Sequence, residues 1–118
     1  MYDYDRYIEG AIIYEDRHRS PYTLGYIVEI SYNRRDAETG ERIAHTFPFV
    51  FKTCMDAFNF ALEQAEEDYR GDDVSIRLEM GSLPYISVDS NVYFGTIATY
   101  NVWKYTQQEE MLYHLLSK

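Results

Sequence analysis

Hydrophobic and polar side chains alternate along two neighbouring stretches of this chain, as in strands that bury one face. In residues 22–32 every second position is apolar, and the row consists of Tyr22, Leu24, Tyr26, Val28, Ile30 and Tyr32. A polar tract containing Gly40 follows, and residues 43–51 then repeat the alternation, so the two runs predict a long hairpin. Because proline cannot donate to a strand ladder, Pro48 indicates an edge strand or a bulge.

Further strands are predicted on both sides of this hairpin. Residues 7–15 are apolar and β-branched enough for a strand, with Gly10 as a bulge or a point of close approach. Residues 74–80 alternate strictly. Residues 86–88 and 92–100, joined by a short polar turn, predict a second hairpin.

Two segments carry the start and stop signals of helices. Thr53 is the expected N-cap of the first, with Asp56 in the reciprocal position of a capping box, and Gly71 is placed to end it. Apolar residues recur at helical spacing between these ends. Thr106 and Glu109 form a second capping box before a short amphipathic helix at the end of the chain.

The predicted order is three strands, a helix, three strands and a helix. Strands joined by short connections favour an antiparallel sheet, and helices with one apolar face favour packing on one side of it. We therefore predict an α+β fold with an antiparallel sheet of about five to six strands and two helices packed on one face. The length of 118 residues fits a single domain, residues 1–118.

The composition is that of a globular protein, with 46% hydrophobic and 26% charged residues. Cys54 is the one cysteine, which excludes an internal disulfide and a cysteine-rich metal site. No secretion signal and no apolar run of about 18 residues is found, so we expect a cytoplasmic protein with no membrane span.

The chain contains no recognised catalytic, phosphate-binding or metal-binding motif, and we expect no cofactor, no metal and no enzymatic activity. His18, His45 and His114 are far apart, and His45 and His114 have ready structural explanations. Cys54 opens a helix, where a thiol is more easily ionised, but no base accompanies it. Packing beneath Phe51 is the simpler role.

Negative charge dominates the chain, with a formal net charge of -9. Residues 63–73 hold six acids and one arginine, more than half of that excess. Glu63 and Glu67 are about 6 Å apart along a helix axis, a spacing of the same order as that of phosphates on a nucleic-acid strand. This charge disfavours direct binding to nucleic acid or anionic membranes and favours a basic protein. A merely solvated helix face is the simpler alternative.

Tyrosine is unusually frequent, with 13 residues. Tyr22, Tyr26 and Tyr32 fit the core pattern, whereas the following are not all explained in that way: Tyr2, Tyr4, Tyr7, Tyr85, Tyr93, Tyr100 and Tyr105. Exposed tyrosine offers a large rigid surface with a polar tip, which binding surfaces use. The N-terminal stretch MYDYDRYIEG therefore looks suited to an arginine-bearing partner, unless it is simply an acidic terminus.

These features predict a non-enzymatic inhibitor that occupies the basic cleft of a nuclease or another nucleic-acid-processing enzyme. In general character the chain resembles phage-encoded anti-defence proteins, such as anti-CRISPR or antirestriction nucleic-acid mimics, and a nuclease immunity protein would share these traits. The expected contact residues are Tyr2, Asp3, Tyr4, Asp5, Glu63, Glu66, Glu67, Asp68, Asp72 and Asp73. Two alternatives remain open: a structural module that self-associates as a homodimer, and a small enzyme or ligand carrier using His45, Cys54 or tyrosine hydroxyls.

Overall fold

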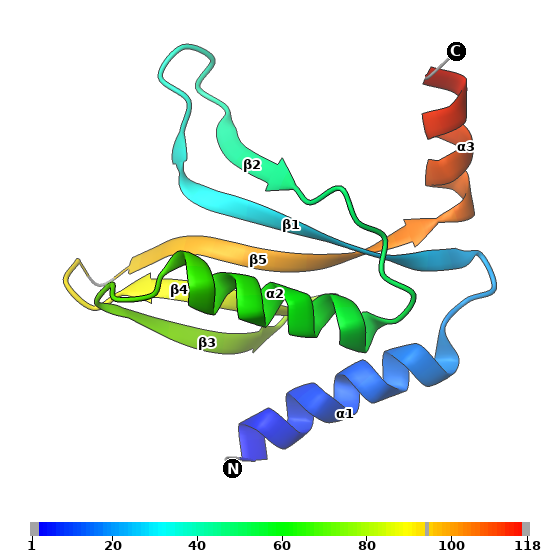
Figure 1. The fold of residues 1–118 in the computed structure, drawn as a ribbon, viewed down its shortest axis with the longest axis horizontal. Helices are drawn as coiled ribbons and strands as arrows, with labels where there is room; N and C mark the ends of the chain where they lie inside the picture. The colour runs from blue at the N-terminus through cyan, green and yellow to red at the C-terminus, as the bar shows by residue number, and fades with distance from the viewer. Residues whose placement is uncertain (1–2, 94, 117–118) are drawn as a thin grey trace.

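The computed structural model describes residues 3–93 and 95–116, with side chains for residues 6–93 and 95–112. Its elements are α1 (Asp3–His18), β1 (Thr23–Arg35), β2 (Arg42–Thr46), α2 (Cys54–Asp68), β3 (Val74–Met80), β4 (Pro84–Ser90), β5 (Gly95–Thr106) and α3 (Gln107–Leu116). The five strands form one sheet in the order β2-β1-β5-β4-β3 (Figure 1). Every neighbouring pair is antiparallel, which confirms the predicted α+β fold.

The first predicted strand is wrong, because residues 7–15 belong to helix α1. Ile8 and Ile12 are almost completely buried, with exposed fractions of 1% and 2%. In a strand, Gly10 and Tyr14 would lie on the same face as these two isoleucines, yet both are exposed. The four-residue spacing of the two isoleucines was therefore the decisive signal, and it outweighed the β-branched composition.

The hairpin of β1 and β2 is confirmed, with Ile30 opposite His45. Strand β2 ends at Thr46, short of the predicted residue 51, because Pro48 interrupts the ladder. The chain returns to β1 at Phe51, which exchanges two backbone hydrogen bonds with Tyr26, at 2.7 and 2.8 Å. Strand β2 lies at one edge of the sheet, as Pro48 predicted.

A close backbone approach at Gly25 explains why β1 does not keep its alternation to the end. The register with β5 shifts between Thr23 and Gly25, and Tyr22 and Leu24, both predicted to be core, are 68% and 41% exposed. A Cβ atom at Gly25 would lie 2.5 Å from the carbonyl oxygen of Phe51. Only glycine fits beneath the returning chain at this point.

The second hairpin is formed by β4 and β5, which pair from Tyr85 opposite Asn101 to Ser90 opposite Gly95. Strand β5 begins later than the predicted residue 92 and extends to Thr106. The Thr106 hydroxyl accepts the backbone N–H of Glu109 at 3.3 Å, which confirms the predicted cap of α3. No helix within the described residues is long and apolar enough to cross a membrane.

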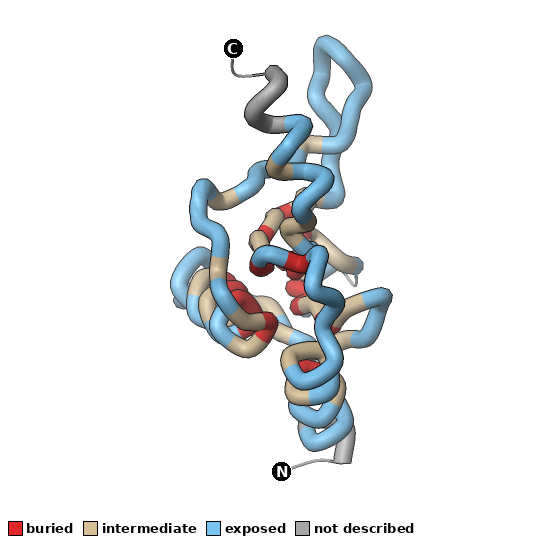
Figure 2. The backbone as a smooth tube through the Cα atoms, turned by 90° about the vertical axis from the view of Figure 1, so that its right-hand side faces the viewer, coloured by how far each residue is buried: buried red, intermediate tan, exposed pale blue. Residues whose placement is uncertain are grey.

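One hydrophobic core joins the sheet to α1 and α2 (Figure 2). Helix α2 packs on β1, β4 and β5, and α1 lies beside α2 and contacts β3 and β4. The fully buried core side chains include Ile8, Ile12, Tyr26, Val28, Cys54, Ala57, Ala61, Ala65, Ile86, Val88, Ala98 and Tyr100. Alanines on the buried side of α2 let the helix approach the sheet closely.

Two buried tyrosine hydroxyls connect the sheet to the two helices. Tyr26 on β1 donates to the Glu15 carboxylate of α1, and Tyr100 on β5 donates to the Asp68 carboxylate of α2, each at 2.6 Å. Both rings have an exposed fraction of 0%, so Tyr100 belongs to the core and not with the surface tyrosines. Burial, and then the bond to a carboxylate, raises the pKa of both phenols, which stay protonated donors at neutral pH.

Helices α1 and α2 are also joined end to end. The Asp16 carboxylate of α1 accepts the backbone N–H groups of Cys54 and Met55, at 2.7 and 3.1 Å. The Thr53 hydroxyl accepts the N–H of Asp56 at 3.0 Å, which confirms the predicted N-cap. A carboxylate at a helix N-terminus also interacts favourably with the helix dipole, so this contact fixes the relative positions of the two helices.

We expect Tyr100→Phe to lower the free energy of unfolding by about 1–2 kcal/mol, because it keeps the ring and removes the charge-assisted bond to Asp68. Urea denaturation measures the difference. The control is Tyr93→Phe, since Tyr93 is 87% exposed and its loss of a hydroxyl should leave stability unchanged. Equal stabilities of the two variants would contradict the assigned role.

Candidate functional site

Helix α2 presents a row of carboxylates on the side facing away from the core. We define the acidic face as the exposed residues Glu63, Glu66, Glu67, Asp72 and Asp73, from α2 and the turn that follows it. Arg70 pairs with Glu67 at 2.7 Å, and both side chains are largely exposed. Phe58 and Ala65 lie on the opposite, buried side of the helix, as the helical spacing predicted.

The carboxylates of this region differ in how they are held. Among the described residues, Glu63 and Glu66 have no hydrogen-bond or ion-pair partner. Asp73 accepts a hydrogen bond from the Asn91 amide at 3.0 Å. Asp68, predicted as a contact residue, accepts bonds from Gln64 at 2.8 Å and Tyr100 at 2.6 Å. Its carboxylate therefore supports the fold from within the acidic region.

The predicted N-terminal contact residues fall at the beginning of the chain. Tyr2 lies outside the described residues, and Asp3, Tyr4 and Asp5 belong to the first turn of α1, with side chains outside the described part. Further along α1, Tyr7 and Tyr14 are 65% and 64% exposed. Helix α1 thus displays phenol rings, although the sequence had suggested a strand here.

A cluster of four phenylalanines beside α2 was not anticipated as a surface feature. Phe47, Phe49 and Phe51 follow β2, and each packs its ring on Phe60 of α2, at centroid distances of 5.0, 5.8 and 5.0 Å. Phe49 remains 51% exposed. The alternation of these residues had assigned them to an inward-facing strand row, and Pro48 was the one signal against that interpretation.

This phenylalanine cluster and the acidic face meet on α2. Phe60 lies four residues after Asp56 and three before Glu63, so the three side chains are neighbours on the helix surface. Asp56 and Glu63 are both exposed. The region therefore combines rigid aromatic rings with carboxylates. The sequence had suggested tyrosines for the rings of such a surface, but here they are phenylalanines.

The residues considered for catalysis have structural surroundings. Cys54 is completely buried, and burial, with Asp16 and Glu15 nearby, raises the pKa of its thiol to about 12, which disfavours the thiolate. His45 is exposed and packs edge-on against Phe47, while His18 donates from Nδ1 to the Tyr14 carbonyl at 3.0 Å. His114 has a side chain outside the described part. Within the described residues no group of histidine, cysteine and acidic side chains is arranged to hold a metal.

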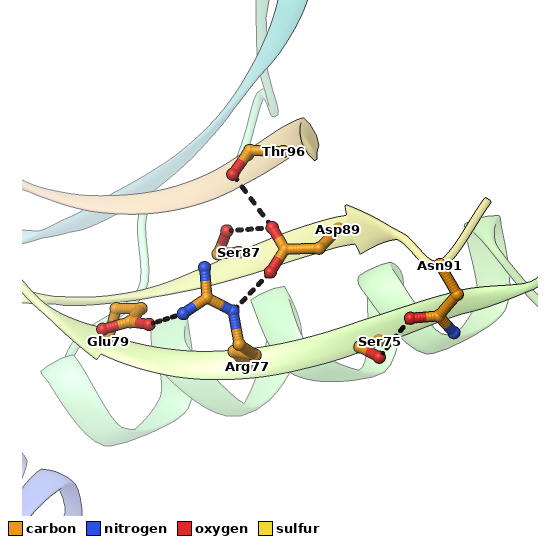
Figure 3. A network of polar contacts seen from close by, with 7 residues as sticks. All are labelled: Ser75, Arg77, Glu79, Ser87, Asp89, Asn91 and Thr96. Carbon is orange, nitrogen blue, oxygen red and sulfur yellow. Dashed lines mark hydrogen bonds and ion pairs between the residues drawn. The ribbon is translucent and has the colours of Figure 1, made fainter. Parts of the chain in front are cut away.

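A second polar group lies on the sheet face that α2 does not cover (Figure 3). Arg77 on β3 pairs with Glu79 and with Asp89 of β4. The Asp89 carboxylate also accepts the hydroxyls of Ser87 at 3.0 Å and Thr96 at 2.9 Å. Burial raises the pKa of Asp89, but the bonds from Arg77, Thr96 and Ser87 lower it by more, so it lies below the ordinary value.

Asp89→Asn should lower the free energy of unfolding at pH 7 by about 1 kcal/mol, because the amide loses the charge that Arg77 and the hydroxyls stabilise. A lowered folded pKa gives stability that is complete above the ordinary aspartate pKa, about 4, and is lost as the pH falls through the folded value. Urea denaturation at pH 7 and pH 3 should therefore show the variant approaching the wild type in acid. A pH-independent difference would contradict this.

No protein-family model, curated protein or solved structure matches this chain. In the acidic face and the adjoining phenylalanine cluster, exposed charge, carboxylates without a partner among the described residues, and apolar area come together. A surface of this composition is electrostatically complementary to positive charge.

Proposed function

We propose that this protein is a non-enzymatic inhibitor whose acidic face occupies the basic cleft of a nucleic-acid-processing enzyme. The observation that carries the proposal is the pair Glu63 and Glu66, which are exposed and have no partner among the described residues, on a helix held firmly to the core. Unpaired carboxylates on a rigid element are available to the cations of another protein.

Rigidity is what makes a row of carboxylates effective as a ligand. The cap from Asp16 and the Tyr100 bond to Asp68 fix both ends of α2. The positions of Glu63, Glu66 and Glu67 are then set by helix geometry, and little backbone order remains to be lost on binding. The net charge of -9 also attracts a basic partner at long range and speeds its approach.

The phenylalanine cluster adds exposed apolar area to the charged surface. Phe49 and the adjacent Val50 are 51% and 54% exposed. Rings of this kind pack against the aliphatic parts of lysine and arginine, and a guanidinium can stack on the ring while it pairs with a neighbouring carboxylate. Asp56 and Glu63 are such neighbours of Phe60. Both a phage anti-defence inhibitor and a nuclease immunity protein would use this chemistry.

Self-association is the second candidate function, and the edge strand β2 favours it. Strand β2 pairs with β1 on one side and ends the sheet on the other. The segment after β2 exposes Phe49 and Val50. An unprotected edge strand can pair with the same strand of a second copy.

The inhibitor proposal is tested with the variant Glu63→Gln/Glu66→Gln/Glu67→Gln. A nucleic-acid-binding partner is captured from a nuclease-rich lysate and identified, and its dissociation constant is measured with and without competing duplex DNA. Loss of three interface charges should weaken the complex at least about tenfold, and DNA and added salt should displace the wild type.

The matched control is Glu9→Gln/Glu38→Gln/Glu41→Gln, which also changes the net charge from -9 to -6 (-9 + 3) and alters exposed positions elsewhere. It should bind like the wild type. Equal weakening of the complex by both triple variants, or a complex that neither salt nor DNA disturbs, would refute the proposal that the acidic face takes the place of nucleic acid in the cleft.

The self-association candidate predicts twice the monomer mass by light scattering of the purified wild type. Ala44→Lys places a charge at an exposed position of β2 and should give a monomer with an unchanged thermal transition. A wild type that stays monomeric at every concentration would exclude this candidate.

A further inference from the structure

A groove around Trp103 lies on the side of the sheet opposite to α2. Alternation along β1 and β5 turns Tyr26 and Val102 into the core, and therefore turns Ile27 and Trp103 outward, where they face each other across the two strands. Trp103 is the one tryptophan in the chain, and it is 47% exposed. A large, half-exposed aromatic ring on a sheet face is an efficient contact surface.

Side chains from several elements form the walls of this groove. It has a volume of about 610 Å³ and is lined by Ile27, Glu29, Ser82, Leu83, Trp103, Lys104, Thr106 and Glu109. These residues come from β1, the β3–β4 turn, β5 and the first turn of α3. Trp103, Ile27 and Leu83 make one part of the lining apolar.

Two carboxylates border the apolar part. Glu29 pairs with Asn101, two residues before Trp103 on β5, so Glu29 and Trp103 are diagonal neighbours on the same face. Glu109 lies in the first turn of α3. Among the described residues, neither carboxylate has an ion-pair or hydrogen-bond partner. The one cation of the lining, Lys104, is already directed to Glu15 of α1, with its Nζ 3.6 Å from the carboxylate.

An aromatic face beside unpaired carboxylates is the arrangement that recognises a guanidinium. The planar cation stacks on an indole and donates to a carboxylate at the same time, and its aliphatic stem packs on apolar side chains. Trp103, Glu29 and Glu109 would contribute these contacts, with Ile27 and Leu83 beneath the stem. We propose that this groove binds an arginine side chain presented by a basic polypeptide partner.

This site lies on the other face of the sheet from the acidic face, so it is independent of the proposed inhibition. It gives the protein a second basic-partner surface, in which recognition depends on one tryptophan and not on a row of charges. The groove is open to solvent, which fits a side chain carried on an extended segment.

Trp103 reports directly on its own groove, since its fluorescence is the chain's tryptophan signal. The probe is an acetylated and amidated heptapeptide of alternating glycine and arginine, titrated into the full chain. We expect a saturable change in emission. The same peptide with citrulline in place of arginine keeps the shape, lacks the charge, and should give no change.

Glu29→Gln/Glu109→Gln should raise the dissociation constant of the arginine peptide at least about tenfold. The matched control Glu38→Gln/Glu41→Gln also moves the net charge from -9 to -7 (-9 + 2), and its dissociation constant should stay within about twofold of the wild type. Far-ultraviolet circular dichroism establishes that both variants are folded.

Three results would overturn the proposal. Equal weakening by the two double variants would mean that the peptide responds to net charge alone. Calorimetric binding without a change in Trp103 emission would place the peptide on another surface. Absence of binding by both methods would mean that the groove does not take arginine.

Discussion

The structure depends on two hydrogen bonds that join buried phenols to helix carboxylates. Tyr26 lies near the start of β1 and Tyr100 in the middle of β5, and their hydroxyls reach Glu15 on α1 and Asp68 on α2. Each bond gives a buried phenol a charged acceptor at the boundary of the core, and losing that acceptor would leave the buried hydroxyl unsatisfied. Within the described residues every buried side-chain polar atom has a hydrogen-bond partner. Tyr26 and Tyr100 are the largest of the fully buried side chains, and these two bonds satisfy their hydroxyls.

Some carboxylates of this protein support the fold, and others lie exposed on α2. Glu15 and Asp68 accept bonds from buried tyrosines and fix the helices, and Glu63 and Glu66 on the outer side of α2 are the carboxylates that we propose meet a partner. The second role needs the first, because a row of charges on a fraying helix would lose much of its binding energy to ordering. Asp68 belongs to the fixing contacts, whereas Glu63 and Glu66, less than two turns away, have no partner in the part of the chain that the structure describes.

The sequence predicted the sheet, α2, the caps and the acidic face, because each follows from local periodicity or a short capping pattern. The prediction from sequence failed where contacts between residues far apart in the chain determine the local structure. Residues 7–15 become a helix since α2 and β3 lie beside them, and Gly25 turns Tyr22 outward because Phe51 returns there. Tyr100 looked like a surface residue because its partner, Asp68, lies 32 positions away. The phenylalanine cluster and the groove at Trp103 likewise assemble from separate elements, which no single stretch of sequence reveals.

An alkaline spectrophotometric titration tests the buried phenols most directly. Their raised pKa means that the folded protein holds these protons more tightly than the unfolded chain, so stability is complete below the ordinary tyrosine pKa, about 10, and falls as the pH rises above it. We predict a fraction of phenolate absorbance that appears only when the circular dichroism signal of the fold is lost, and that disappears in Tyr26→Phe/Tyr100→Phe. Ionisation of all tyrosines near their ordinary pKa in the folded protein would contradict the account.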